Sequence, residues 1–203
     1  TIKLNMTGKY ILMNDIIFED SDYDKGGNFY NSGKGWEPIG TYSTNFRGVF
    51  DGNGYKIKNL YINNPEQDYI GLFGYISGAS IKNITLINSY IVGQNYTGGI
   101  VGYISSSTVT HSNYSGSVSG KNYVGGIAGC SIYSSTISYC NTQKSVVGTQ
   151  NVGGIVGYQY SSGSTSSVYY NYIRYCNNAS IVKGESYVGG ISGSTVMFAP
   201  SAE

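Results

Sequence analysis

Short apolar segments recur along this chain at a nearly constant interval. The most regular is a tetrapeptide with a glycine at each end and an aliphatic residue after the first glycine. Its five copies begin at Gly71, Gly99, Gly126, Gly154 and Gly190, so the intervals are 28, 27, 28 and 36 residues. A repeat of this length is typical of a solenoid, in which each repeat forms one structural unit stacked on the last.

Two further columns of apolar residues follow the tetrapeptides. Their members are Ile81, Val109, Ile137 and Ile173 in one column, and Ile91, Val118, Val146 and Val182 in the other. The apolar runs are short, rich in Ile, Val, Tyr and Thr, and bounded by Gly, Ser or Asn, which is typical of strands. Stacked coils would lie about 4.8 Å apart, with right-handed connections. The pattern predicts an all-β fold, a right-handed parallel β-helix with about 27–28 residues in each three-sided coil.

The whole chain, residues 1–203, is predicted to be a single β-helix domain of six or seven coils. Residues 1–66 form its irregular N-terminal coils with a long polar loop at 19–34, and residues 67–195 form the regular repeats. The interval of 36 residues indicates a loop insertion at about 159–170. Because the chain begins at Thr1 without an apolar leader, we expect it to be a piece of a longer protein.

Four segments occur in the order seen in a known repeat family. They are Trp36–Gly40, Phe46–Gly54, Asn59-Leu60 and the first tetrapeptide, Gly71–Gly74. In this order they resemble the GLUG-motif repeat solenoids of bacterial surface adhesin-like proteins and of non-catalytic regions of immunoglobulin A-cleaving metalloproteases. The resemblance implies an extracellular or cell-surface location and a spacer or display role. It does not imply a ligand.

Composition excludes several classes of protein. Only 11% of the residues are charged and the net charge is +1, which argues against a nucleic-acid partner. A chain with 40% hydrophobic residues is too apolar for disorder, and it has no segment long enough to insert into a membrane.

Of the three cysteines, Cys140 and Cys176 fall in one column and should be neighbours. We expect two reduced, stacked thiols there, with a disulfide as the alternative.

Catalytic residue sets are missing from the sequence. His111 is the only histidine, so neither an HExxH zinc site nor a pair of histidine ligands can form. Glycan-cleaving β-helices need convergent carboxylates, whereas Asp51 and Asp68 are too isolated to make a convincing pair. The chain is therefore predicted not to be an enzyme and to need no cofactor, unless it binds calcium.

Two irregular segments supply the candidate sites. Glu19, Asp20, Asp22 and Asp24 precede Gly26 in the acidic loop, and alternating carboxylates of this kind can bind calcium. Their spacing differs from that of an EF-hand loop, and a solvated acidic loop is the alternative. The candidate ligand-binding residues of the insertion are Tyr160, Tyr169, Tyr170 and Tyr172. Tyrosines among serines are typical of adaptable recognition surfaces, here for a host or matrix protein or a glycan.

The tyrosines of the repeats also recur at fixed positions. Tyr75, Tyr103 and Tyr158 each follow a tetrapeptide, and Tyr96, Tyr123 and Tyr187 share another position. Such ladders bind sugars when exposed and pack coil on coil when buried, and we expect packing.

The preferred function is a non-enzymatic extracellular scaffold, either an adhesin or display module or a stalk. One alternative is a filament-forming unit that associates end to end, and the other is a glycan-binding or glycan-active β-helix.

Overall fold

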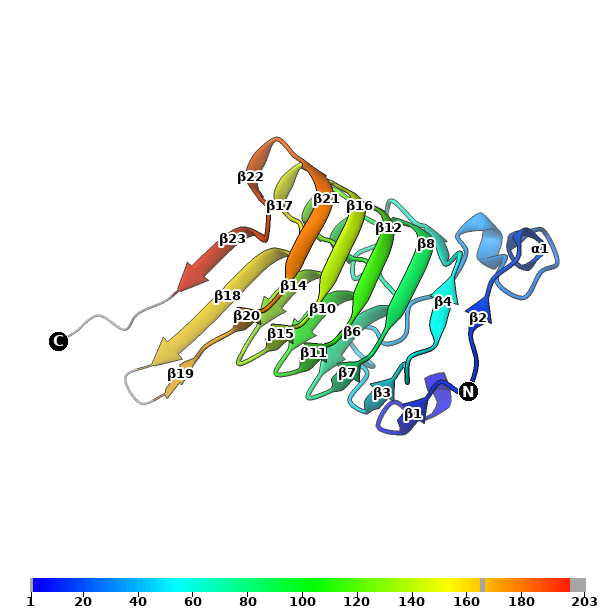
Figure 1. The fold of residues 1–203 in the computed structure, drawn as a ribbon, viewed down its shortest axis with the longest axis horizontal. Helices are drawn as coiled ribbons and strands as arrows, with labels where there is room; N and C mark the ends of the chain where they lie inside the picture. Colours follow the sequence, from blue (N-terminus) through cyan, green and yellow to red (C-terminus); the bar gives the residue numbers. More distant parts are fainter. Residues whose placement is uncertain (1, 165–166, 198–203) are drawn as a thin grey trace.

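The computed structural model describes residues 2–164 and 167–197, over which the chain winds into a parallel β-helix (Figure 1). Strands of successive coils pair in parallel, and the hairpin between β18 and β19 supplies an antiparallel pair. The predicted fold class is therefore confirmed. Within the described ranges, no helix combines the length and the apolar character that crossing a bilayer requires.

Four sheets run along the axis of the helix. Sheet A contains β1 (Lys9–Ile11), β3 (Val49–Asp51), β7 (Ser80–Lys82), β11 (Thr108–Thr110), β15 (Thr136–Ser138) and β20 (Tyr172–Arg174). Sheet B contains β2 (Ile16–Ile17), β4 (Lys56–Lys58), β5 (Tyr61–Asn63), β8 (Thr85–Val92), β12 (Asn113–Ser119), β16 (Asn141–Val147) and β21 (Asn177–Lys183). Sheet C contains β6 (Phe73–Ser77), β10 (Val101–Ser105), β14 (Ala128–Ile132), β18 (Val156–Ser164), β19 (Ser167–Tyr169) and β23 (Ser192–Met197). Sheet D contains β9 (Asn95–Gly98), β13 (Asn122–Gly125), β17 (Gln150–Gly153) and β22 (Ser186–Gly189).

Helical structure is confined to the N-terminal region of the described chain. It consists of the single-turn helix α1 (Asp20–Tyr23) and two 3-10 turns at Ile2–Leu4 and Asn31–Gly33. The six strands of sheet A correspond to six coils, within the predicted six or seven. In Figure 1 these coils follow one another from the N-terminal end, where α1 lies, to the C-terminal end, where β20–β23 lie.

Each regular coil carries four strands rather than the three that the apolar runs predicted. The additional strands are those of sheet D, which end at the glycine just before each tetrapeptide. They are only four residues long, and in three coils each directs one fully buried side chain into the core, Thr97, Val124 or Val152, with Asn151 of β17 as a further buried residue. A run with one apolar position does not stand out from a glycine-rich corner, which explains why this strand was missed.

Strand register confirms the predicted columns. Ile81 pairs with Val109, Val109 with Ile137, and Ile137 with Ile173. The column through Ile91, Val118, Val146 and Val182 is aligned in the same way. Members of both columns are fully buried in the inner coils and only partly buried in the last coil. The core is thus a continuous stack of aliphatic side chains that runs along the axis.

The first glycine of each tetrapeptide marks a close approach between coils. A Cβ at Gly126 would lie 2.3 Å from the carbonyl oxygen of Gly154 and 2.7 Å from Cγ2 of Thr142. A side chain at this position would therefore separate the stacked backbones. In the last coil the equivalent Gly190 would meet nothing within 4 Å. Glycine recurs at this position because each coil must accept the next one directly on its backbone.

The predicted insertion forms a hairpin rather than an irregular loop. Strand β18 runs beyond its pairing with β14 and then pairs in the antiparallel direction with β19, with Ser162 opposite Tyr169. Residues 165 and 166 of the predicted insertion lie outside the described residues. In Figure 1 the hairpin extends from the C-terminal half of the helix, beside β23.

Candidate functional site

The acidic residues Glu19, Asp20, Asp22 and Asp24 lie at and around helix α1. The Asp22 carboxylate accepts a hydrogen bond from the backbone N–H of Glu19 at 3.0 Å, which caps the start of the helix. Over residues 2–164 and 167–197, no three carboxylate, thiol or imidazole side chains come together in a group that could hold a metal ion. The structure therefore gives Asp22 a local capping role, and calcium binding by the acidic residues stays an untested prediction.

The loop that carries these carboxylates is held by aromatic packing. Phe29 packs edge-on against Phe18 with the ring centroids 5.0 Å apart, and Trp36 lies 5.9 Å from the same ring. The Tyr23 hydroxyl donates to the carbonyl of Asn59 and accepts from the N–H of Tyr61, and burial raises its pKa to about 12. An apolar cavity of about 480 Å³ opens beside this cluster. The sequence predicted a polar loop and missed that its aromatic residues cover the N-terminal coils.

The tyrosines of the insertion are only partly brought together. Tyr169, Tyr170 and Tyr172 are exposed, whereas Tyr160 is half-buried within β18. The rings of Tyr170 and Tyr172 lie 6.4 Å apart, and the Arg174 guanidinium lies 4.0 Å from the centroid of the Tyr172 ring. The sequence did not single out Arg174, although its position two residues after Tyr172 in a strand places both on one face. These rings form a small exposed patch, and their role in ligand binding stays a prediction.

The repeat tyrosines form two meshed ladders, one centred on Tyr96 and one on Tyr103. Tyr96 stacks between Tyr69 and Tyr123, with centroid separations of 5.1 and 4.8 Å and interplanar angles of 8° and 5°. Tyr103 stacks on Tyr75 at 4.7 Å and meets Tyr96 edge-on at 5.3 Å. Burial raises the pKa of Tyr96 to about 12 and raises that of Tyr103 as well. Both faces of an inner ring are therefore occupied by protein, as expected of packing.

These tyrosines adopt a backbone conformation that is rare for aromatic residues. Tyr69, Tyr96 and Tyr123 have φ values of 62°, 54° and 59°, in the left-handed region. Each turns the chain at the entry to a tetrapeptide coil, and a Cβ on Gly129 would lie 2.5 Å from the carbonyl carbon of Tyr96. The left-handed backbone at these tyrosines thus occurs where a glycine of the next coil approaches closely, and stacking of the rings stabilises this backbone conformation.

His111 belongs to a third stack, on the outside of the helix. Its ring lies 4.7 Å from Tyr139, and Tyr139 lies 4.8 Å from Tyr175, with angles of 14° and 18°. All three residues are exposed, and Tyr175 is 74% exposed. The histidine is one rung of an aromatic ladder, which accounts for it without a catalytic role.

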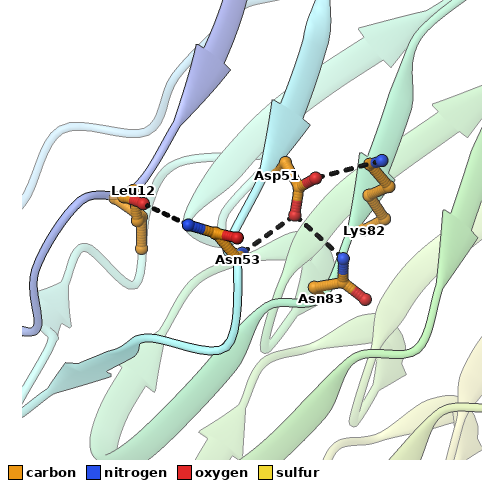
Figure 2. Close-up of polar contacts among 5 residues, drawn as sticks. All are labelled: Leu12, Asp51, Asn53, Lys82 and Asn83. Carbon is orange, nitrogen blue, oxygen red and sulfur yellow. Dashed lines mark hydrogen bonds and ion pairs between the residues drawn. The ribbon is translucent and has the colours of Figure 1, made fainter.

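Asp51 is held by three donors at the corner after β3 (Figure 2). Its carboxylate accepts from the N–H of Asn53 at 2.8 Å and from Nδ2 of Asn83 at 2.9 Å, and it pairs with Nζ of Lys82 at 3.0 Å. The hydrogen bond from Asn83, followed by the interaction with Lys82, lowers the pKa of this carboxyl. A general acid needs the opposite shift, so the environment of Asp51 is that of a structural carboxylate.

Asp68 is likewise part of a ladder. It accepts from the N–H and the Nδ2 of Asn95 at 3.1 and 2.9 Å, and Asn122 Nδ2 then donates to Asn95 Oδ1 at 2.9 Å. The carboxylate therefore begins a run of side-chain amides along the coils. Each amide bridges two coils, and the polar side chains of the corners are used in stacking just as the aliphatic ones are.

A shallow hollow of about 420 Å³ lies beside sheet B. Among its lining residues are the aligned amides Asn113, Asn141 and Asn177, together with Ser115 and Gln143. Asn141 Nδ2 donates to Asn113 Oδ1 at 2.8 Å, so two of the amides are already paired. Neither a carboxylate nor an imidazole is among the described residues that line it. The hollow offers amide and hydroxyl groups to a ligand but no acid–base pair.

Comparisons with known proteins find relatives that match part of this chain. No family model matches the chain, so membership of the GLUG-motif family stays an expectation. A protein of Evansella cellulosilytica provisionally described as a Gly-rich membrane protein is 45% identical over 60 residues, which are 29% of this chain and 7% of that protein. Halomucin of Haloquadratum walsbyi is 42% identical over 74 residues, or 36% of this chain and 1% of that protein. The chain thus matches only a small part of each relative.

A solved structure shares the fold. It is the crystal structure of a chain from Bacteroides ovatus that is provisionally described as an immunoglobulin A1 protease. The likeness covers 94% of this chain and 56% of that one, with a TM-score of 0.68 and 23% sequence identity. At this identity the likeness establishes the architecture, and the activity in the name of that protein does not transfer with it.

Proposed function

We propose that this chain is a non-enzymatic extracellular β-solenoid module of a larger surface or secreted protein, serving as an adhesin-like display scaffold or stalk. The observation that carries the proposal is how side chains of successive coils contact one another. Aliphatic columns fill the interior, while tyrosine, asparagine and carboxylate side chains at the corners bond or stack to a residue of the next coil. A structure of this kind holds its two ends apart at a fixed distance, roughly 25 Å across six stacked coils.

The relatives support the same assignment. The matched segments are 7% and 1% of proteins far longer than this chain, one of which is described as a membrane protein. Repeats that occupy a small part of a long protein are suited to spacing or display, because nearest-neighbour stacking makes their length adjustable without altering the fold.

Antibody labelling of the source organism tests the location. Antibodies raised against the chain should label intact cells, or the culture medium, as strongly as they label permeabilised cells. Labelling that appears only after permeabilisation would contradict an extracellular module.

Incubation of the purified chain with immunoglobulin A1 and with a panel of polysaccharides tests the absence of activity. Product formation that survives further purification would overturn the non-enzymatic assignment.

Self-association is a second candidate because the last coil leaves interior side chains exposed. Val188 and Ile191 are 45% and 40% exposed, although the equivalent residues of the preceding coil, Val152 and Ile155, are fully buried. Strands β20, β21 and β22 stand at the ends of their sheets, with backbone groups available for a further strand.

Sedimentation velocity over a range of concentrations tests this candidate. Association should weaken when Ile191 is replaced by glutamate, because the substitution places a charge on the end of the stack. Ile181→Glu is the matched control, since Ile181 is 64% exposed on the outer face of sheet B. A chain that stays monomeric at every concentration would contradict end-to-end association.

A further inference from the structure

Cys140 and Cys176 lie directly opposite each other in the last two coils. Ser138 pairs with Arg174 before them and Asn141 pairs with Asn177 after them, so the register places the two cysteines side by side. The N–H of Asn177 also donates to the carbonyl of Cys140 at 2.9 Å. Paired parallel strands lie about 4.8 Å apart, within the Cα separation of about 4.4–6.8 Å that a disulfide needs.

The two thiols are oriented alike. Cys140 Sγ donates to the carbonyl of Ser138 at 3.2 Å, and Cys176 Sγ makes the equivalent contact to Arg174 at 3.3 Å. Cys176 Sγ also lies 3.7 Å from the carbonyl of Ile137, in the coil of Cys140. The Cys176 sulfur is therefore directed across the gap between the coils, toward the coil of its partner.

We propose that Cys140 and Cys176 are a disulfide-forming pair that fastens the last coil to the one before it. Both thiols are free in this structure, and the reduced pair is one of its two states. The third cysteine, Cys130, lies in β14 of sheet C, in register with Tyr103 and Tyr158 rather than in this column. The pairing is thus specific to two of the three thiols.

The two thiols differ in solvent exposure and in acidity, and these differences show which of them attacks the oxidant. Cys176 is half-buried in the last coil, whereas Cys140 is fully buried. Interaction with the neighbouring Cys140 thiol favours the Cys176 thiolate and lowers the pKa of Cys176. An accessible thiolate is the form that attacks a disulfide, so Cys176 is the attacking residue.

A small-molecule disulfide such as oxidised glutathione is the oxidant. The Cys176 thiolate attacks one glutathione sulfur, forming a mixed disulfide and releasing one glutathione thiolate. Cys140 sulfur then attacks the Cys176 sulfur, and the second glutathione leaves as a thiolate that takes up the Cys140 proton. Two protein thiols are oxidised and one glutathione disulfide is reduced to two thiols, so atoms and electrons balance.

The bond would act where the fold is weakest. The last coil contributes Ile173 and Val182 to their columns, and both are less buried than their counterparts in the inner coils. The closed segment runs from β16 to β20, includes the β18–β19 hairpin and ends at the corner before β21. A link across its ends opposes fraying of the end of the stack in an oxidising environment, and the inference does not depend on the proposed function.

The experiment uses the full chain carrying Cys130→Ser, which removes the third thiol. The folded protein is equilibrated with oxidised glutathione, remaining thiols are alkylated, and trypsin then places Cys140 in peptide 122–144 and Cys176 in peptide 175–183. The expected result is a linked pair of these peptides that reduction separates, in a monomer lighter by two hydrogens. A terminal mixed disulfide with glutathione, or a Cys176-linked dimer, would overturn the proposal.

Hydrogen exchange tests the consequence of the link. Amides of β21 and β22 should exchange about tenfold more slowly in the oxidised protein than in its reduced form. The variant that also carries Cys140→Ser should show the same exchange under both conditions. A link that forms without slowing exchange in these strands would overturn the fastening role, while leaving the chemistry of the pair intact.

Discussion

Ile155 and Ile191 occupy the same position in successive coils and differ only in what stacks on them. Ile155 is fully buried between the coils of Ile127 and Ile191, whereas Ile191 is 40% exposed at the end of the column. Replacing each with alanine removes the same atoms from two environments. The pair therefore measures how much of the stability of a coil comes from having a neighbour on both sides.

The expected magnitudes follow from the buried groups. Ile155→Ala removes three buried carbons at about 0.8 kcal/mol each, and the cavity left between two coils brings the cost to about 2–5 kcal/mol. Ile191 already exposes 40% of its surface and its site is open on one side. The transfer term there falls to about 1.5 kcal/mol, and the surrounding side chains can relax into the space.

Thermal unfolding by circular dichroism, with urea unfolding as a second measurement, gives the comparison. For a domain of this size, 1 kcal/mol corresponds to about 2–4 °C, so the expected losses are about 4–20 °C for Ile155→Ala and about 3–6 °C for Ile191→Ala. Equal losses would refute the reasoning, because they would mean that the last coil is covered as completely as an inner one. A loss below about 2 °C for Ile155→Ala would refute the column assignment itself.

Other positions give matched tests of the same structure. Gly126→Ala should destabilise by about 1–3 kcal/mol in urea unfolding because its Cβ meets the Gly154 carbonyl, whereas Gly190→Ala, with open space, should be neutral or slightly stabilising. Because the pKa of Asp51 is lowered, its contribution is present above about pH 4 and is lost as the pH falls through the folded value. Urea unfolding at a series of pH values should therefore show a steeper acid loss for the parent than for Asp51→Asn, and parallel curves would contradict this. Asp22→Ala should lower stability by about 1 kcal/mol with or without calcium through loss of the cap at α1, and a calcium-dependent rise in melting temperature that this variant abolishes would establish the metal site instead.

Sequence periodicity was sufficient to predict the stacked columns. A column residue such as Val109 must be apolar and must recur at the coil length, since the same interior position is filled once per coil. The cysteine neighbours followed from the same counting, because Cys140 and Cys176 keep a constant offset from their columns. Every prediction of this kind needed only the repeat length and the hydrophobic effect.

Features that depend on contacts between columns could not be predicted in this way. Packing of Tyr96 against Tyr103 joins two positions that lie seven residues apart and on different strands. The acidic loop contains both carboxylates and aromatic residues. The carboxylates were the more conspicuous feature of the sequence, although Tyr23 and Phe29 are the residues that hold the loop in place. No repeat of these residues exists elsewhere in the chain to reveal that they pack against the core.

Because side chains repeat in columns, the position of an aromatic ring within its column decides whether a ligand can stack on it. An inner rung such as Tyr96 has a ring on each face, and a ligand that stacks on it must first displace a neighbour that is held by the backbone. The last rung of a ladder meets no such competition. Tyr175, stacked on Tyr139 and 74% exposed, is such a rung, and it is close in sequence to Tyr172 and Arg174. Partners that bind through aromatic stacking should therefore favour the C-terminal coil over the regular faces of the helix.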